Sequence, residues 1–191
     1  MEERALSTLK VMLTDRGLTA DTLETIASTL DDAKLYSFAG VLIVFSTKAR
    51  ISEKDLHACI EYAKENNYSA GMILVGLSKP SETVINSLRN YISQRDVPPV
   101  HMFEIRHLQL QFAKHAWLVP KHRIVESSEL ADILKNENAK DPSVFAKIDS
   151  QDAMAKWVGA RPGDVLEITG GCESSVENKH YRFCMADVVN G

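Results

Sequence analysis

The chain has 191 residues, 45% of them hydrophobic and 25% charged, a composition typical of a soluble globular protein of one or two domains. We expect two domains. No apolar run approaches the ~20 residues that span a bilayer, and residues 1–4 carry no apolar signal-peptide core. We therefore expect no membrane partner and a nuclear or cytoplasmic location. The net charge of −4 argues against bulk nucleic-acid binding, because affinity for phosphates comes mainly from Lys and Arg.

Two helices are predicted before the first strand. Leu6, Leu9 and Leu13 have helical spacing, and Gly17 stands where a left-handed C-terminal cap is expected. A second helix, capped by Thr19, is predicted because the apolar residues that follow keep the spacing of a buried helical face. These residues are Leu23, Ile26, Ala27 and Leu30.

Short continuous apolar runs at 41–45 and 72–75 predict strands buried on both faces of a parallel sheet. The helix between them begins at Ser52, and Asp55 completes a capping box. Another helix follows, with Pro80 in its first turn, and a third strand at about 100–105 completes a β-α-β-α-β order with right-handed crossovers. The helix residues predicted to face the sheet are Leu56, Cys59, Ile60, Ala63, Val84, Ile85, Leu88 and Ile92.

The stretch 106–117 mixes charged and apolar residues without a clean period, which predicts a boundary between domains at 1–110 and 111–191. In the second domain, Ser127 or Ser128 is expected to cap a helix, and Ala153–Val158 to form a short one. Strands are predicted at 165–168 and at about 180–188, with a polar loop at 170–178 between them. This pattern indicates an α+β domain with a small mixed sheet.

Residue patterns for catalysis or for a cofactor are absent. Gly76, Lys79 and Ser81 follow a strand but lack the spacing of a phosphate-binding loop. A metal-dependent nuclease is disfavoured because the runs at 41–45 and 72–75 contain no acidic residue. Three cysteines without a Cys-x-x-Cys pair, and histidines 101, 107, 115 and 122 without zinc-ligand spacing, predict no metal site. We expect no catalytic residue and no cofactor.

Several short motifs follow one another along the chain. Arg4-Ala5-Leu6 and Asp15-Arg16-Gly17 lie in the first helix and at its end, and His115 to His122 contain Trp-Leu-Val-Pro-Lys-His. Then come Asp152, Ala155, Gly159, Arg161, Gly163, Asp164 and Val165, and finally Tyr181 and Arg182. In order and spacing these motifs resemble the family of the fifth shared subunit of the eukaryotic nuclear RNA polymerases, which also has archaeal RNA polymerase members.

The resemblance implies a non-catalytic structural subunit of a DNA-dependent RNA polymerase in the nucleus, or in the nucleolus if it is dedicated to ribosomal RNA synthesis. Its N-terminal domain would be an α/β jaw, with a small, mainly parallel sheet flanked by helices, near downstream duplex DNA. Its C-terminal assembly domain would dock on the largest subunit and contact other polymerase subunits. The jaw would be open to transcription factors.

The resemblance also implies two sets of site residues. The DNA-proximal residues are Lys79, Pro80 and Ser81. The subunit-interface residues are His115, Trp117, Leu118, Val119, Pro120, His122, Arg161, Gly163, Tyr181 and Arg182. For Trp117 a core position and an interface position both suit a large aromatic side chain, and we favour the interface.

Some positions depart from the family pattern. The stretch from Gly170 to Glu177 replaces a basic loop before the last strand, Ala116 replaces a second consecutive His, and Lys79 stands where Thr is usual. These departures leave open a paralogue dedicated to a single nuclear polymerase, or a member from a divergent lineage or virus. Separate alternatives are a stand-alone adaptor and a nuclease-like α/β protein, the latter disfavoured by the missing acidic residues.

Overall fold

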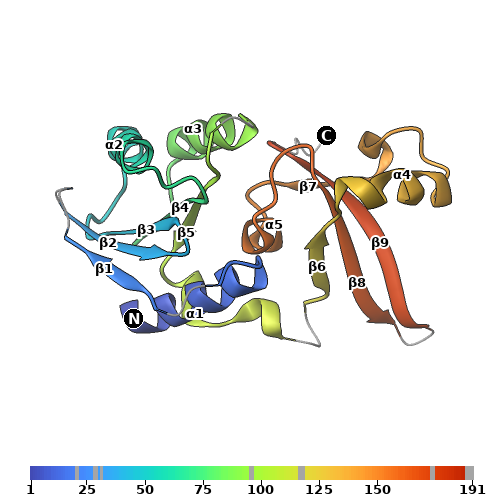
Figure 1. Cartoon of the computed structure of the whole chain (residues 1–191), viewed down its shortest axis with the longest axis horizontal. Coiled ribbons are helices and arrows are strands. Elements are labelled where there is room, and N and C mark those ends of the chain that lie inside the picture. The colour runs from blue at the N-terminus through green and yellow to red at the C-terminus, as the bar shows by residue number, and fades with distance from the viewer. Residues whose placement is uncertain are drawn as a thin grey trace. The chain divides into compact units, whose positions relative to one another are not determined.

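The chain divides into two compact units, Met1–Gln111 and Phe112–Gly191, whose helices and strands are labelled in Figure 1. Each unit has buried hydrophobic clusters of its own. The computed structural model describes residues 1–19, 22–27, 30, 32–94, 97–115, 119–172 and 175–187. The first unit contains α1 (Glu2–Asp15), β1 (Glu24–Ile26), β2 (Ala33–Phe38), β3 (Val41–Ser46), α2 (Glu53–Glu65), β4 (Gly71–Gly76), α3 (Glu82–Ser93), β5 (Val100–Glu104) and the 3-10 turn η1 (His107–Gln109).

The sheet of the first unit has the strand order β1-β2-β3-β4-β5. Strands β3, β4 and β5 pair in parallel and are almost wholly buried, as their apolar runs predict. Strands β1 and β2 add two antiparallel pairs at one edge. The sheet is therefore mixed, and the expected mainly parallel arrangement holds only for three of its strands.

Residues 24–26 form an edge strand, so the helix predicted after Thr19 is wrong at this point. Thr25 and Ile26 are β-branched, and Ile26 pairs with Leu35 of β2 and packs on the core. Strand β2, which was not predicted, joins β3 through the two-residue turn Ala39-Gly40, in which both residues have positive φ. The apolar residues have helical spacing, but residues 24–26 pair with the free edge of the β2–β3 hairpin and form a strand instead.

Helices cover both faces of this sheet, with α1 on one face and α2 and α3 on the other (Figure 1). In α1, Leu9 and Leu13 are buried, Leu6 only partly, and Gly17 has the expected left-handed conformation, with φ 81°. The phenolic oxygen of Tyr36 donates to a Glu2 carboxylate oxygen at 2.7 Å, which ties the start of α1 to β2. The three layers bury the central strands completely.

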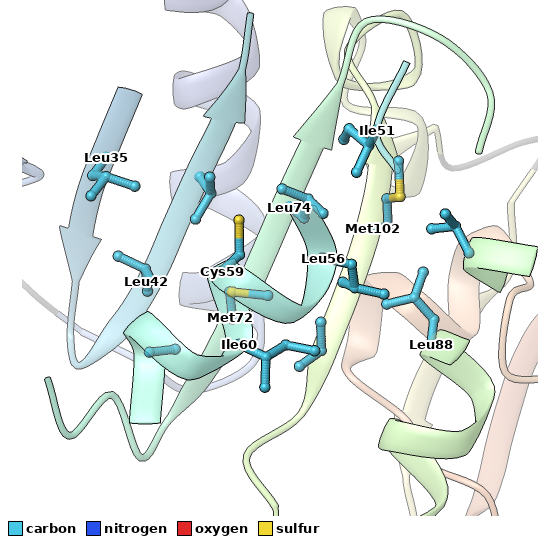
Figure 2. Close-up of a cluster of buried hydrophobic side chains, with 14 residues drawn as sticks. Leu35, Leu42, Ile51, Leu56, Cys59, Ile60, Met72, Leu74, Leu88 and Met102 are labelled. Atoms are coloured by element: carbon cyan, nitrogen blue, oxygen red, sulfur yellow. The ribbon is translucent and has the colours of Figure 1, made fainter. Parts of the chain in front are cut away.

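Helices α2 and α3 pack their apolar faces into one core with the strands, drawn in Figure 2. Ser52 and Asp55 form the predicted capping box of α2, and all four predicted α2 residues are buried. In α3, Val84, Leu88 and Ile92 are buried, and Ile85 is partly exposed. Pro80 was predicted to lie in the first turn of this helix. The helix begins after it, at Glu82, because Ser81 is the N-cap.

The second unit contains η2 (Phe112–Lys114), β6 (Lys121–Ile124), α4 (Ser127–Asn136), η3 (Pro142–Val144), β7 (Ala146–Asp149), α5 (Ala153–Val158), β8 (Val165–Cys172) and β9 (Ser175–Met185). Its sheet has the order β6-β8-β9-β7, with β7 parallel to β9 and the other pairs antiparallel, which confirms the mixed sheet. Short helix α5 is also where the sequence predicts it, capped by Asp152 and ended by left-handed Gly159.

Three details of this unit differ from the expectations. The polar stretch 170–178 is not a loop, because β8 and β9 continue into it with paired backbones, apart from residues 173 and 174, which lie outside the described part. The last strand, β9, runs from Ser175 to Met185, so it begins and ends earlier than the predicted range of about 180–188; residue 188 itself lies outside the described part. Helix α4 is not capped by Ser127 or Ser128, because both lie inside the helix and Glu126 is the N-cap.

Candidate assembly surface

The sheet of the second unit has two faces of different character. One face packs on α5 through Ile124, Leu166 and Cys184, and we call it the α5 face. The other packs on α4 through Val165, Tyr181 and Phe183, and we call it the α4 face. Because successive strand residues point to opposite faces, neighbours in sequence separate here. The predicted interface residues Tyr181 and Arg182 therefore lie on opposite faces of β9.

An ion cluster occupies the α4 face. Arg123 of β6 donates to both carboxylate oxygens of Glu167 in β8, at 3.1 and 2.8 Å, and to Glu129 of α4 at 2.6 Å. Lys179 lies 3.8 Å from Glu167. The hydrogen bonds from Arg123 hold the pKa of the buried Glu167 carboxyl below its usual value. Arg123 is thus fully engaged within the chain, and its role is structural.

The α5 face carries a different set of polar side chains. His122 and His180 both pair with Ile168 in the strand register, and Arg182 follows His180 on the same face of β9. The Nδ1 atom of His122 lies 2.8 Å from the carbonyl oxygen of Pro120. Burial lowers the pKa of His122, and the nearby charges of Arg182 and His180 lower it further, while Asp152 acts in the opposite sense.

Arg182 is half-buried, and its Nε atom is inaccessible to solvent and has no hydrogen-bond partner among the described residues. The structure thus places two of the predicted interface residues, His122 and Arg182, on the same face of the sheet, on strands that flank β8. It adds His180, which the sequence reasoning missed. The signal was available in the alternation of the last strand, because residues 180 and 182 share one face.

Arg161 and Gly163 lie in the turn between α5 and β8. The backbone N–H of Arg161 donates to Asp164 Oδ2 at 2.8 Å, and the N–H of Gly163 donates to the carbonyl of Cys184 at 2.8 Å. Cys184 in turn donates its N–H to the carbonyl of Asp164. Gly163 has φ 94°, a conformation that favours glycine. These bonds fasten the start of β8 to β9, so this motif shapes the turn.

The predicted interface residues before β6 are only partly described. His115 is exposed, Val119 and Pro120 are half-buried, and the Val119 N–H donates to the His115 carbonyl at 3.0 Å. Trp117 and Leu118 lie outside the described residues. The assignment of Trp117 to an interface therefore stays a prediction.

The predicted DNA-proximal residues stand where α3 begins. Ser81 accepts a hydrogen bond from the Val84 N–H at 3.5 Å, so its hydroxyl serves the helix N-terminus. Lys79 is exposed, and Pro80 is half-buried. Ser78 donates to the carbonyl of Ala49 at 2.5 Å and anchors this loop to the chain before α2. The geometry leaves the Lys79 ammonium group facing solvent.

The described residues give no support for catalysis in the first unit. A cavity of about 280 Å³ lies beside Cys59, Ser46 and the ion pair between Lys48 and Asp55. Burial raises the pKa of the Cys59 thiol to about 11, so it is protonated and a poor nucleophile. No group of three or more His, Cys, Asp or Glu side chains in the described ranges is placed to hold a metal ion. Within the same ranges, no helix has the length and apolar character needed to cross a membrane.

Comparisons with known proteins point to one family. The model of the RNA polymerase Rpb5 C-terminal domain matches residues 111–184. The DNA-directed RNA polymerase subunit Rpo5 of Aeropyrum pernix is 38% identical over 68 residues, which cover 36% of this chain and 74% of that protein. Rpo5 of Sulfurisphaera tokodaii is 39% identical over 69 residues, 36% of this chain and 81% of that protein.

A eukaryotic relative matches a longer stretch. The DNA-directed RNA polymerases I, II, and III subunit RPABC1 of Caenorhabditis elegans is 26% identical over 148 residues. The match covers 75% of this chain and 65% of that protein. The resemblance therefore extends beyond the stretch 111–184 that the family model matches.

Proposed function

The chain belongs to the Rpb5 family of RNA polymerase subunits, and from this premise we propose that it is a non-catalytic structural subunit of a DNA-dependent RNA polymerase. The observation that carries the proposal is the stretch matched by the Rpb5 C-terminal model, residues 111–184, which nearly coincides with the second structural unit, Phe112–Gly191. Nucleotidyl transfer then belongs to other subunits.

The C-terminal domain, 111–191, docks on the largest subunit and holds the chain in the polymerase. The support is its own hydrophobic core, which is separate from the core of the first unit. In addition, the archaeal relatives that are named as subunits are 74% and 81% covered by matches of 68 and 69 residues. A stretch of this size thus makes up most of a polymerase subunit in those organisms.

The N-terminal domain, 1–110, forms part of the lower jaw beside downstream duplex DNA. The exposed Lys79 at the start of α3 supplies a full positive charge next to the partial positive charge of the helix N-terminus. Because the net charge of the chain is −4, this contact adds to the polymerase grip on DNA rather than binding DNA alone. The eukaryotic relative's name refers to polymerases I, II, and III, and we propose a nuclear location.

The test is purification of the tagged full-length chain from cells of its source, with identification of co-eluting proteins by mass spectrometry. We expect the largest subunit and further subunits of an RNA polymerase in stoichiometric amounts. Largest subunits of all three nuclear polymerases would indicate a shared subunit, and one alone a dedicated paralogue. Elution without any polymerase subunit would contradict the proposed function and favour a stand-alone adaptor.

A further inference from the structure

Two arginines on opposite faces of the C-terminal sheet differ in their surroundings. Arg123, on the α4 face, donates to the carboxylates of Glu167 and Glu129. Arg182, on the α5 face, has no ion pair with any described residue, and its Nε–H is buried without an acceptor. A buried donor without an acceptor destabilises the fold, because its bond to water is lost and not replaced. The terminal nitrogens of this guanidinium group are not among the buried unbonded atoms, so they are the donors that an external carboxylate could reach.

The groups around Arg182 favour an anionic acceptor. His180 lies two residues away on the same face, and His122 lies across Ile168 from His180. Both Arg182 and His180 act electrostatically on His122. The nearby carboxylate of Asp152 makes no ion pair with Arg182; one of its oxygens caps α5 and accepts from the N–H groups of Met154 and Ala155, at 2.8 and 3.3 Å. The α5 face therefore has a cationic group in need of a carboxylate that the described chain does not supply.

We propose that Arg182, with His122 and His180 beside it on the α5 face, receives a carboxylate side chain from an acidic segment of a neighbouring polymerase subunit. The proposal rests on the proposed function and names the chemistry of its docking surface. The planar guanidinium group matches a carboxylate in a bidentate geometry, and such charge-assisted bonds are the stronger ones in proteins. The half-buried position of Arg182 reduces screening by salt.

A nucleic-acid phosphate is the less favoured occupant. Sites for a phosphate backbone usually gather several Lys and Arg side chains, whereas two of the three basic groups here are histidines and Asp152 lies nearby. Burial also lowers the pKa of His122, so this side chain adds little positive charge at neutral pH. One fixed charge in a half-buried setting suits a single carboxylate.

The first experiment replaces Arg182 by Met in the tagged full-length chain and measures the polymerase recovered with it. We expect retention of the largest subunit to fall about tenfold or more, while the thermal stability of the isolated chain stays the same or rises, because the buried unmet donor is removed. Lys147→Glu is the matched control, since Lys147 is exposed on strand β7 of the same sheet and pairs in register with Phe183 of the α4 face. This control should keep full retention.

Two results would overturn the proposal: retention of Arg182→Met equal to wild type, or a loss of retention that follows a matching loss of thermal stability. The second result would make Arg182 a structural residue. If the wild-type chain itself recovers no polymerase, the proposed function fails, and this inference fails with it. Normal wild-type recovery with an unaffected Arg182→Met variant removes only the inference.

A second experiment identifies the occupant. A photoreactive phenylalanine analogue at position 180, which is exposed on the same face, is incorporated into the full-length chain and cross-linked within the purified polymerase. We expect a cross-linked protein segment with an excess of Asp and Glu. Cross-linking to a neutral or basic segment, or to nucleic acid, would contradict an acidic protein partner.

Discussion

At the scale of single residues, side-chain direction decides what a motif can do. The adjacent Tyr181 and Arg182 were predicted together as interface residues, yet the strand turns Tyr181 towards Phe145 and Arg182 to the other face. The sequence predicted the strand that carries both residues, because alternation along a strand is a strong pattern; their role at an interface stays a prediction. It could not identify Glu167 as the partner of Arg123, because 44 positions separate them and only the pairing of β6 with β8 brings them together.

The Glu167 ion pair should stabilise the C-terminal unit in a pH-dependent way. The pKa of Glu167 is lowered from 4.5 in the folded chain, so its contribution is present above 4.5 and is lost as the pH falls through the folded pKa. We expect Glu167→Gln to cost about 1–2 kcal/mol at neutral pH, because Arg123 is partly solvent-screened, and to cost almost nothing in strong acid.

Urea unfolding followed by tryptophan fluorescence measures this, because both tryptophans, Trp117 and Trp157, belong to the unit Phe112–Gly191. Glu129→Gln is the matched control, with an expected cost below about 1 kcal/mol, since Glu129 is exposed and makes only one bond to Arg123. Equal costs for the two variants at neutral pH would show that the buried carboxylate has no special role.

Lys79 gives a second prediction at this scale. Lys79→Glu should leave subunit assembly intact and make retention of downstream DNA by the polymerase more sensitive to salt, because one phosphate contact changes the slope of log K against log salt by about one unit. Lys54→Glu, an exposed change on α2, is the control. Salt-titration curves of DNA retention that coincide for the wild type and Lys79→Glu would mean that this loop is only a solvated helix start.

At the scale of elements, strong local patterns were reliable and edge strands were not. Helix α2 was predicted with its capping box and its buried face, because both are encoded within 13 residues. The edge strand β1 was predicted as a helix, and β2, β6 and β7 were not predicted. Short strands at or near a sheet edge have only a few inward-facing apolar residues. Their strand conformation therefore depends on the partner strand rather than on a periodic pattern in their own sequence.

Gly71, at the start of β4, tests how closely two strands approach. It has φ 127°, and a Cβ atom there would lie 2.8 Å from the carbonyl oxygen of Pro99. We expect Gly71→Ala to destabilise the first unit by about 3 kcal/mol, from backbone strain and overpacking together. At Gly17 φ is 81°, and a Cβ atom added there would have no non-neighbouring atom of the described residues within 4 Å. We therefore expect Gly17→Ala to cost only about 1 kcal/mol.

Hydrogen exchange of the amides of β4 in the full-length chain gives both opening free energies, and it does not depend on tryptophan, which the first unit lacks. Both glycines have positive φ, so the difference between Gly71→Ala and Gly17→Ala reports the close contact of the added methyl group with Pro99. Similar losses of protection in the two variants would show that the strands move apart to admit the methyl group.

At the scale of the whole molecule, the two units have their own buried clusters, whereas length and composition allowed either one or two domains. The proposed division of labour between docking and DNA contact did not follow from composition or periodicity. It comes from the family, whose C-terminal model begins at the edge of the second unit. Partner identity is a property of surfaces, and surface residues are the least constrained by folding.

The most direct test of this account separates the two units. Residues 112–191 and residues 1–111 are each tagged and produced in cells of the source, after circular dichroism has shown that each is folded, and the recovered largest polymerase subunit is quantified against the full chain. We predict recovery with residues 112–191 within about threefold of the full chain, and background recovery with residues 1–111. Recovery of the largest subunit by residues 1–111 alone would contradict docking through the C-terminal domain.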